Sequence, residues 1–348
     1  MTIVDTRRVC GGVDTHADFH VAAALDHIGG LLGIETFETT EAGYRRLLEW
    51  LRGWGEVIRV GVEGTGSYGA GLVRHLHADG VEVVEVDRPN RQLRRREGKS
   101  DPTDAVAAAR AALSGQADGE PKRRNGPVEQ MRVILVARRS ARDQRIQTLN
   151  QIRHLVMCGP EPVRRRYQHS SPSVLVKQLC ATRPRPQGND PVTHTTVVTL
   201  RDLARRVRTL DHELDTIGDQ LTGLVAATAP SLLTIHGLAA QGAATLLVAA
   251  GDNPERIRSE AAWAHLCGTA PIPASSGKTT RYRLNRGGNR HANAVLHQIV
   301  LTRMANDPRT RAYVTRHRQK GRTNPEIMRM LKRYVAREIY KHLPRPHN

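Results

Sequence analysis

The sequence is poor in aromatic residues and in cysteine. Only 3% of its 348 residues are aromatic, which argues against a protein that binds single-stranded nucleic acid by stacking bases on aromatic side chains. The four cysteines, Cys10, Cys158, Cys180 and Cys267, are widely scattered and form no C-x-x-C pair. Their spacing therefore encodes neither a disulfide framework nor a zinc site, and it fits a reducing compartment.

Long apolar segments are also absent. No apolar run reaches the roughly 18 residues that a membrane-spanning helix needs. The first residues, MTIVDTRRVCGGVD, lack the apolar region of a secretory signal. We therefore expect a soluble, cytoplasmic protein with no membrane partner.

Acidic residues are outnumbered by basic ones. The chain has 53 Lys and Arg against 34 Asp and Glu, a formal net charge of +19, and its pI is near 10.7. From Lys278 onward there are 18 basic and three acidic residues, which leaves +15 in this segment alone. Such a balance is typical of proteins that bind phosphate backbones. Nucleic acid is the expected partner, and the alternative is a ribosomal-type or merely soluble basic protein.

Five short β-rich runs predict a sheet in the first part of the chain. They are VCGGVD, FHVAAALD, LLGIETFET, VIRVGVEG and VEVVEVD, which begin at residues 9, 19, 31, 57 and 81. The first three follow one another closely, as in an antiparallel meander, and the last two alternate with helical patterns. This order predicts an α/β domain with a mixed sheet.

The middle of the chain is predicted to be helical. A long basic helix is expected from Pro127, and a second helix carries apolar residues at steps of three and four from Leu200 to Leu224. This seam predicts a coiled coil, within the chain or between chains, or else a buried bundle helix. The proline-containing stretch 170–191 between them is expected to be an irregular loop or hinge.

The stretch KSDPTDA, residues 99–105, places two carboxylates three residues apart around a proline. With Asp101 as N-cap, Pro102 at the first helical position and Asp104 two residues later, it is a favourable helix start. The same spacing puts both carboxylates on one helix face, so the stretch could also supply half of a catalytic site.

Two other acids follow apolar runs. Asp14 ends the first run and Glu63 ends the fourth, and the ends of strands are where α/β sheets carry functional sites. If the first and fourth strands are neighbours, Asp14 and Glu63 lie close together, and Asp101 and Asp104 can join them. Four clustered carboxylates repel one another unless a cation is present, and oxygen ligands suit Mg²⁺ or Mn²⁺. His16 and His20 rank below these acids, because such spacing is common in surface turns.

The segments GVDTH, VEGTGSYG and KSDPTDA, in this order, resemble the D-E-D-D motifs of the insertion-sequence one-ten family of transposases, which are related to the Piv invertase. The resemblance implies an RNase H-like N-terminal domain similar to the Holliday-junction resolvase RuvC. It also implies that Asp14, Glu63, Asp101 and Asp104 are catalytic residues and metal ligands.

The segment GTAPIPASSGKTTRYRLNRGGNRHANAVLH, residues 268–297, is similar to the C-terminal transposase domain of the same family. Ser276, which precedes Gly277, matches the nucleophilic serine of that family, and Ser275 stays open as the alternative. A serine that attacks phosphorus needs cations around the transition-state charge. The candidates for nucleic-acid binding are Lys278, Arg281, Arg283, Arg286 and Arg290.

The resemblance implies three regions: a RuvC-like domain over 1–118, a helical coiled-coil region for oligomerisation over 119–227, and a mainly α-helical transposase domain over 228–348. It implies an enzyme that moves an insertion sequence by cutting and rejoining donor and target DNA through a phosphoserine intermediate, with Mg²⁺ or Mn²⁺. A structured bridge RNA would guide it, and dimers would assemble into a tetramer. The alternatives are a RuvC-type, metal-dependent, structure-selective nuclease and a non-catalytic nucleic-acid-binding protein.

Overall fold

The computed structural model describes residues 7–86, 100–184, 190–277 and 282–344. The chain divides into two compact units. The first comprises the chain up to Glu129 together with Ala250–Trp263, and the second comprises Gln130–Ala249 and Ala264–Pro344. The expected three-region division at residues 118/119 and 227/228 stays a prediction.

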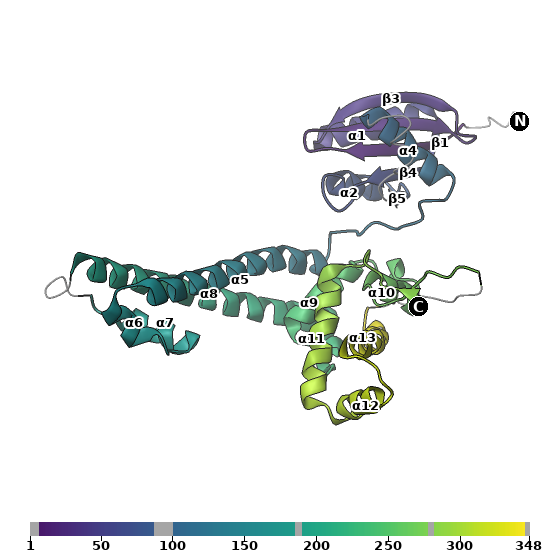
Figure 1. The fold of residues 1–348 in the computed structure, drawn as a ribbon. Coiled ribbons are helices and arrows are strands. Elements are labelled where there is room, and N and C mark those ends of the chain that lie inside the picture. The colour runs from purple at the N-terminus through teal and green to yellow at the C-terminus, as the bar shows by residue number, and fades with distance from the viewer. Residues whose placement is uncertain (1–6, 87–99, 185–189, 278–281, 345–348) are drawn as a thin grey trace, which may run out of the picture. The chain divides into compact units, whose positions relative to one another are not determined.

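The first unit contains the predicted mixed sheet (Figure 1). Its five strands are β1 (Arg8–Thr15), β2 (Phe19–Asp26), β3 (Leu31–Glu38), β4 (Glu56–Glu63) and β5 (Val83–Val86), in the order β3-β2-β1-β4-β5. The first three strands form the expected antiparallel meander, and β4 and β5 run parallel to β1. The first and fourth strands are neighbours, which is the condition under which Asp14 and Glu63 were expected to lie close together.

The two faces of the sheet are covered by different helices. Helices α1 (Glu41–Trp54) and α2 (Ala70–Ala78) share a hydrophobic core with Val9, Val13 and Val60. Helix α4 (Asp101–Leu113) packs on the other face, against Cys10. Because side chains alternate between the faces of a strand, every second residue of β1 and β4 faces α4.

Two glycines let α4 approach the sheet closely. Gly12 of β1 and Gly61 of β4 are register partners. A Cβ atom built on Gly12 would lie 2.1 Å from the backbone nitrogen of Ala109, and one on Gly61 would lie 2.6 Å from the carbonyl oxygen of Ala108. Since no side chain fits in that space, the backbones of α4 and of both strands are in direct contact.

The second unit is mainly helical, as predicted. Its first part contains α5 (Pro127–Cys158), which begins in the first unit, and α6 (Glu161–Tyr167), α7 (Pro172–Ala181) and α8 (Pro191–Thr228). The expectation of irregular structure over 170–191 is wrong for α7. Pro172 occupies the first turn of that helix, where its missing N–H costs nothing and its fixed φ suits a helix.

The apolar seam of α8 packs within the chain. Helices α5 and α8 lie side by side (Figure 1), with Arg145 of α5 paired with Asp211 of α8. Leu200 and Val207 share a core with Ile152 of α5, Tyr167 of α6 and Leu179 of α7. The seam is therefore at least partly a bundle face, and coiled-coil pairing between chains stays a prediction.

Further helices and a small hairpin make up the rest of the chain that the structure describes. The elements are two 3₁₀ helices (Pro230–Thr234 and Pro254–Arg256), α9 (Ala240–Ala250), α10 (Glu260–Leu266), β6 (Ile272–Pro273), β7 (Tyr282–Arg283), α11 (Arg290–Asn306), α12 (Pro308–Gln319) and α13 (Asn324–Tyr340). Across the described segments, every helix is too short or too polar to traverse a lipid bilayer.

Replacing Gly12 by alanine should destabilise the first unit, because the new methyl group would push α4 away from β1. We expect a loss of about 1–3 kcal/mol in the free energy of unfolding. All three tryptophans, Trp50, Trp54 and Trp263, belong to this unit, so their fluorescence during urea unfolding measures it.

Gly53→Ala is the matched control. Gly53 lies in α1, and a Cβ atom there would have no neighbour within 4 Å. This change should be neutral or stabilising by roughly 0.5–1 kcal/mol. Equal urea midpoints for Gly12→Ala and Gly53→Ala would contradict the close contact of α4 with the sheet.

Candidate metal centre

Asp14 lies near the end of β1 and faces α4. It shares a sheet face with Gly12, two residues earlier, and it is a buried residue, 8% exposed. Glu63, the last residue of β4, shares a face with Gly61 in the same way. The parallel register pairs Val13 with Val62. Asp14 and Glu63 are the next residues on these two strands, so they lie at corresponding positions on neighbouring strands. The sheet thus presents both acids to the face that α4 covers.

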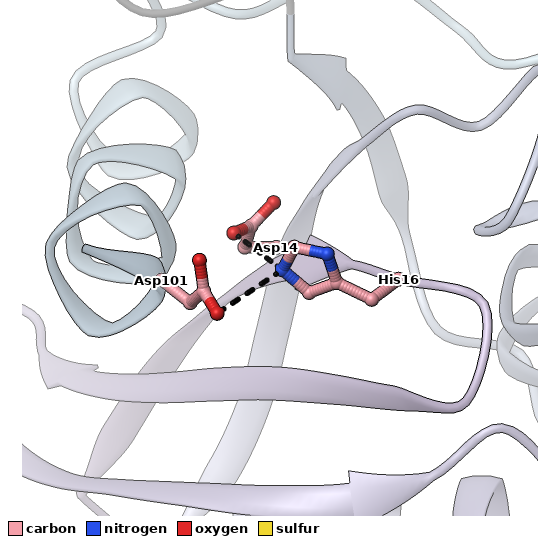
Figure 2. A group of neighbouring side chains, drawn as sticks. All are labelled: Asp14, His16 and Asp101. Atoms are coloured by element: carbon pink, nitrogen blue, oxygen red, sulfur yellow. Dashed lines mark hydrogen bonds and ion pairs between the residues drawn. The ribbon is translucent and has the colours of Figure 1, made fainter. Parts of the chain in front are cut away.

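Helix α4 begins one residue earlier than its sequence indicates. Ser100, with an extended backbone, is the N-cap, and Asp101 is the first helical residue. The prediction that Asp101 caps the helix is therefore wrong. The Ser100 side chain hydrogen-bonds with the Thr103 hydroxyl at 2.7 Å, whereas the Asp101 carboxylate is directed toward β1 (Figure 2).

His16 bridges the two aspartates (Figure 2). Its Nε2 atom lies 3.2 Å from Oδ2 of Asp14 and 3.4 Å from Oδ2 of Asp101. Each of the three side chains offers one potential metal-ligand atom, and these atoms all lie within 4.8 Å of one another. Among the described residues, this is the group of Asp, Glu, His or Cys side chains that could hold a metal ion. His16, ranked below the acids from sequence, is therefore part of the site.

The turn after β1 holds His16 in this position. Its backbone N–H donates to the carbonyl oxygen of Phe19 at 3.1 Å, and its carbonyl oxygen accepts from the Thr39 hydroxyl at 3.2 Å. The imidazole also packs against the Phe19 ring, with 5.2 Å between ring centroids. The return of the chain into β2 thus sets the imidazole beside Asp14.

The electrostatics of the site favour the binding of a cation. Burial raises the pKa of the Asp14 carboxyl, and the carboxylates of Asp104 and Asp101 raise it further, while His16 opposes the shift. Asp104 is also buried, 4% exposed. A buried carboxylate beside two others is destabilised unless positive charge compensates it. The donor set of carboxylate oxygens and one imidazole nitrogen fits a divalent metal ion.

Glu63 and Asp104 lie outside the three-residue group. The backbone around Glu63 is nevertheless well defined, because its carbonyl oxygen accepts a 2.9 Å hydrogen bond from the Thr15 hydroxyl. Gly64 follows with φ +68°, a conformation that side chains disfavour, and this turn ends β4. Membership of Glu63 and Asp104 in a metal-binding tetrad stays a prediction.

The candidate serines lie in the second unit. Ser275 and Ser276 are exposed residues between β6 and β7. Of the predicted cationic residues around them, Arg283 lies on β7, Arg286 lies in the following segment and Arg290 begins α11. Lys278 and Arg281 lie outside the described residues. The serine and the acidic site therefore belong to different units of the chain.

Two family models match the chain. A transposase model of the DEDD type from the IS110 family matches residues 11–157. A second model, described as the transposase IS116/IS110/IS902 family, matches residues 229–315. Together these matches support an IS110-family transposase. IS110 is the insertion-sequence one-ten family, whose D-E-D-D motifs the segments around the four acids resemble.

A curated relative agrees with the family models. The chain is 29% identical over 146 residues to the insertion element IS110 uncharacterized 43.6 kDa protein of Streptomyces coelicolor. The match covers 41% of this chain and 36% of that protein, so it spans about a third of the relative's length. The first IS110 model includes all four predicted acids, and the second includes Ser276 and the three described arginines. The DEDD type of the first model also suggests dependence on a divalent metal.

Asp14→Asn should stabilise the metal-free protein at neutral pH. Because the folded protein raises the pKa of Asp14, the folded state binds its proton more tightly than the unfolded state. The Asp14 carboxylate therefore disfavours folding increasingly as the pH rises above 3.8, and the penalty is complete once the pH exceeds the raised value. The asparagine removes this penalty, and its advantage should shrink as the pH falls toward the ordinary aspartate pKa of 3.8.

Urea unfolding in the presence of a chelator, followed by tryptophan fluorescence, measures this effect. Asp18→Asn is the control, because Asp18 is an exposed residue in the same turn, and it should change the midpoint little. A lower midpoint for Asp14→Asn than for the wild type at neutral pH would contradict the electrostatic account of the site.

Proposed function

We propose that this chain is a DNA transposase that cuts and rejoins strands with a metal-dependent acidic site in its first unit and a covalent bond between Ser276 and a DNA phosphate. The observation that carries this proposal is the convergence of Asp14 from β1 and Asp101 from α4 on His16 (Figure 2). It lies within the segment matched by the IS110 DEDD model. Transposases act on DNA, and the strongly basic composition is consistent with that partner.

The first unit is proposed to be RNase H-like, as in RuvC. Support comes from its mixed sheet, with an antiparallel meander followed by two parallel strands. Further support comes from the position of Asp14 and Glu63 at the ends of adjacent strands. In this proposal the catalytic acids are Asp14, Glu63, Asp101 and Asp104.

Asp14, Asp101 and His16 would hold Mg²⁺ or Mn²⁺, and Glu63 and Asp104 face the same region. When bound, the cation supplies positive charge that neutralises phosphate oxygens during strand cleavage. Without the cation, contacts between the protein's own residues hold these side chains together. His16 lies between two carboxylates that would otherwise repel, and the turn after β1 fixes its position.

In the proposed reaction, the Ser276 hydroxyl oxygen attacks phosphorus and forms a new phosphorus–oxygen bond. The bond from phosphorus to one neighbouring sugar oxygen breaks, and that oxygen leaves as a hydroxyl with a proton that balances the one lost by serine. The phosphodiester energy is retained in the serine ester, so a DNA hydroxyl can later reverse the step and join strands. Arg283, Arg286 and Arg290, with Lys278 and Arg281, would stabilise the developing charge.

The proposed partners also follow from the family resemblance. A structured bridge RNA would pair with donor and target DNA, which is consistent with the lack of a zinc finger or basic zipper for base recognition. Dimers that assemble into a tetramer would bring the units of different subunits together. The α8 seam is the candidate for such pairing.

Ser276→Ala should abolish covalent protein–DNA adduct formation, because alanine has no nucleophilic oxygen. The test incubates the full chain with DNA of the element ends, Mg²⁺ and the RNA transcribed beside the gene, followed by a denaturing gel. Ser275→Ala is the matched control and should retain the adduct.

The other outcomes separate the competing functions. If Ser276→Ala still cleaves DNA and the wild type forms no adduct, the chain is a nuclease of the resolvase type. If Asp14→Ala and Glu63→Ala leave every activity unchanged, the acids have no catalytic role. Loss of the adduct in Ser275→Ala alone would transfer the nucleophilic role to Ser275.

His16→Ala should weaken the binding of Mn²⁺ to the protein. Loss of a side chain that ligates a metal, or orients its ligands, typically lowers affinity by about tenfold or more. Electron paramagnetic resonance of free Mn²⁺ measures this without any DNA substrate. His27→Ala is the control, because His27 is an exposed residue in the next turn. Equal affinity of both variants would exclude His16 from the metal centre.

A further inference from the structure

The C-terminal part of the second unit contains a large groove. Its volume is about 1140 Å³, which exceeds the roughly 300–1,000 Å³ of ordinary small-molecule pockets. The groove is lined by β7, by the segment that leads to α11, by the start of α11 and by α13. Its size and open walls suit a segment of a polymer.

The walls of the groove are strongly basic. The cationic lining residues are Arg283, Arg286, Arg290, Arg329, Lys332, Arg333 and Arg337, and Glu326 is the acidic lining residue. The Glu326 carboxylate accepts hydrogen bonds from the backbone N–H and the hydroxyl of Thr323, at 2.8 and 2.7 Å. These bonds lower its pKa and use the carboxylate as part of the α13 N-cap. The groove therefore keeps a large positive charge.

One half-buried cation of the groove, Lys332, is held by a hydrogen bond. The Lys332 ammonium donates a 2.9 Å hydrogen bond to Oδ1 of Asn293, whose Nδ2 donates to the carbonyl oxygen of Cys267 at 2.8 Å. Burial and the neighbouring Arg329 lower the pKa of Lys332. Because Asn293 is neutral, it orients the ammonium without cancelling its charge. A partly desolvated, oriented ammonium is suited to a phosphate oxygen.

Two exposed tyrosines also line the groove. Tyr282 is 65% exposed and Tyr334 is 52% exposed. The Tyr334 ring makes an edge-to-face contact with Tyr313, with centroids 5.9 Å apart, which supports the ring from one side. Exposed aromatic rings beside cations are the arrangement that stacks unpaired bases. The low aromatic content argued against such stacking for the whole chain, but two of its few aromatic side chains lie here.

We propose that this groove binds an unpaired stretch of DNA strand, with phosphates on the α13 cations and bases stacked on Tyr282 and Tyr334. The strand would lead toward the serine, because Tyr282 pairs with Pro273 in the hairpin whose connection contains Ser276. Double-stranded DNA would contact the cations through its phosphates but would not stack on the tyrosines, because its bases are already stacked on one another. This inference rests on the proposed function for the identity of the strand.

The test measures binding of fluorescently labelled oligothymidylate of about 15 nucleotides to the full chain by anisotropy. Tyr334→Ala should weaken binding by about tenfold, and Tyr334→Phe, which keeps the ring, should bind like the wild type. Arg333→Ala should weaken binding and reduce the slope of log affinity against log salt by about 0.7. Arg311→Ala, which removes an exposed cation of α12 outside the groove, should have a smaller effect.

Further probes identify the strand. The affinity for duplex DNA should be unchanged by Tyr334→Ala. An oligouridylate of the same length should bind the wild type no more tightly than oligothymidylate does. Equal loss for Tyr334→Ala and Tyr334→Phe, or equal loss for duplex and single strand, would overturn the stacking proposal. Tighter, tyrosine-dependent binding of oligouridylate would assign the groove to RNA instead and would also overturn it.

The outcomes also separate this proposal from the proposed function. If the wild type forms the Ser276 adduct but Tyr334→Ala binds oligothymidylate normally, the groove assignment fails and the function stands. If binding depends on Tyr334 but no adduct forms with element-end DNA, the function fails and the groove remains a single-strand site. Urea unfolding of each variant, followed by far-ultraviolet circular dichroism because the tryptophans belong to the first unit and α13 to the second, excludes loss of fold as the cause.

Discussion

The direct backbone contact between α4 and the sheet is the constraint on which the candidate metal centre depends. Gly12 and Gly61 are partners on adjacent strands, and neither has space for a methyl group beneath α4. The alanines of α4, such as Ala105 and Ala109, are the matching surface, because they are fully buried without holding the helix away. The first turn of α4 is thereby held beside the ends of β1 and β4, where Asp14 and Glu63 lie.

This arrangement accounts for the presence of buried acids in a strongly basic protein. The carboxylates are gathered in the first unit, where Asp14 and Asp104 are largely removed from water. The groove cations and the candidate serines belong to the second unit. A metal ion would compensate the acids, and a nucleic-acid backbone would compensate the cations. Each unit thus has its own electrostatic requirement, and the components of the proposed phosphodiester reaction would meet both requirements.

The sheet could be predicted because its strands are short apolar runs, each ended by a polar residue or a glycine. Asp14 and Glu63 could be placed at strand ends for the same reason. The start of α4 was predicted one residue late, because Ser100 and Asp101 are both good cap residues and the sequence alone does not decide between them. The helix α7 was missed because proline was interpreted as a breaker, although it begins that helix.

Two features could not be predicted because they depend on long-range packing. His16 contacts Asp101 across 85 positions of the chain, and only the packed position of α4 makes that contact. The one local signal was its position two residues after Asp14. In the groove, Tyr282 and Tyr334 come from separate elements, so composition alone indicated no aromatic site.

Anomalous diffraction from crystals of the full chain soaked in Mn²⁺ tests the central claim most directly. The account predicts a peak in contact with the side chains of Asp14, His16 and Asp101. A well-occupied manganese peak elsewhere, with none between these side chains, would contradict the proposal that α4 completes a metal centre at the ends of β1 and β4.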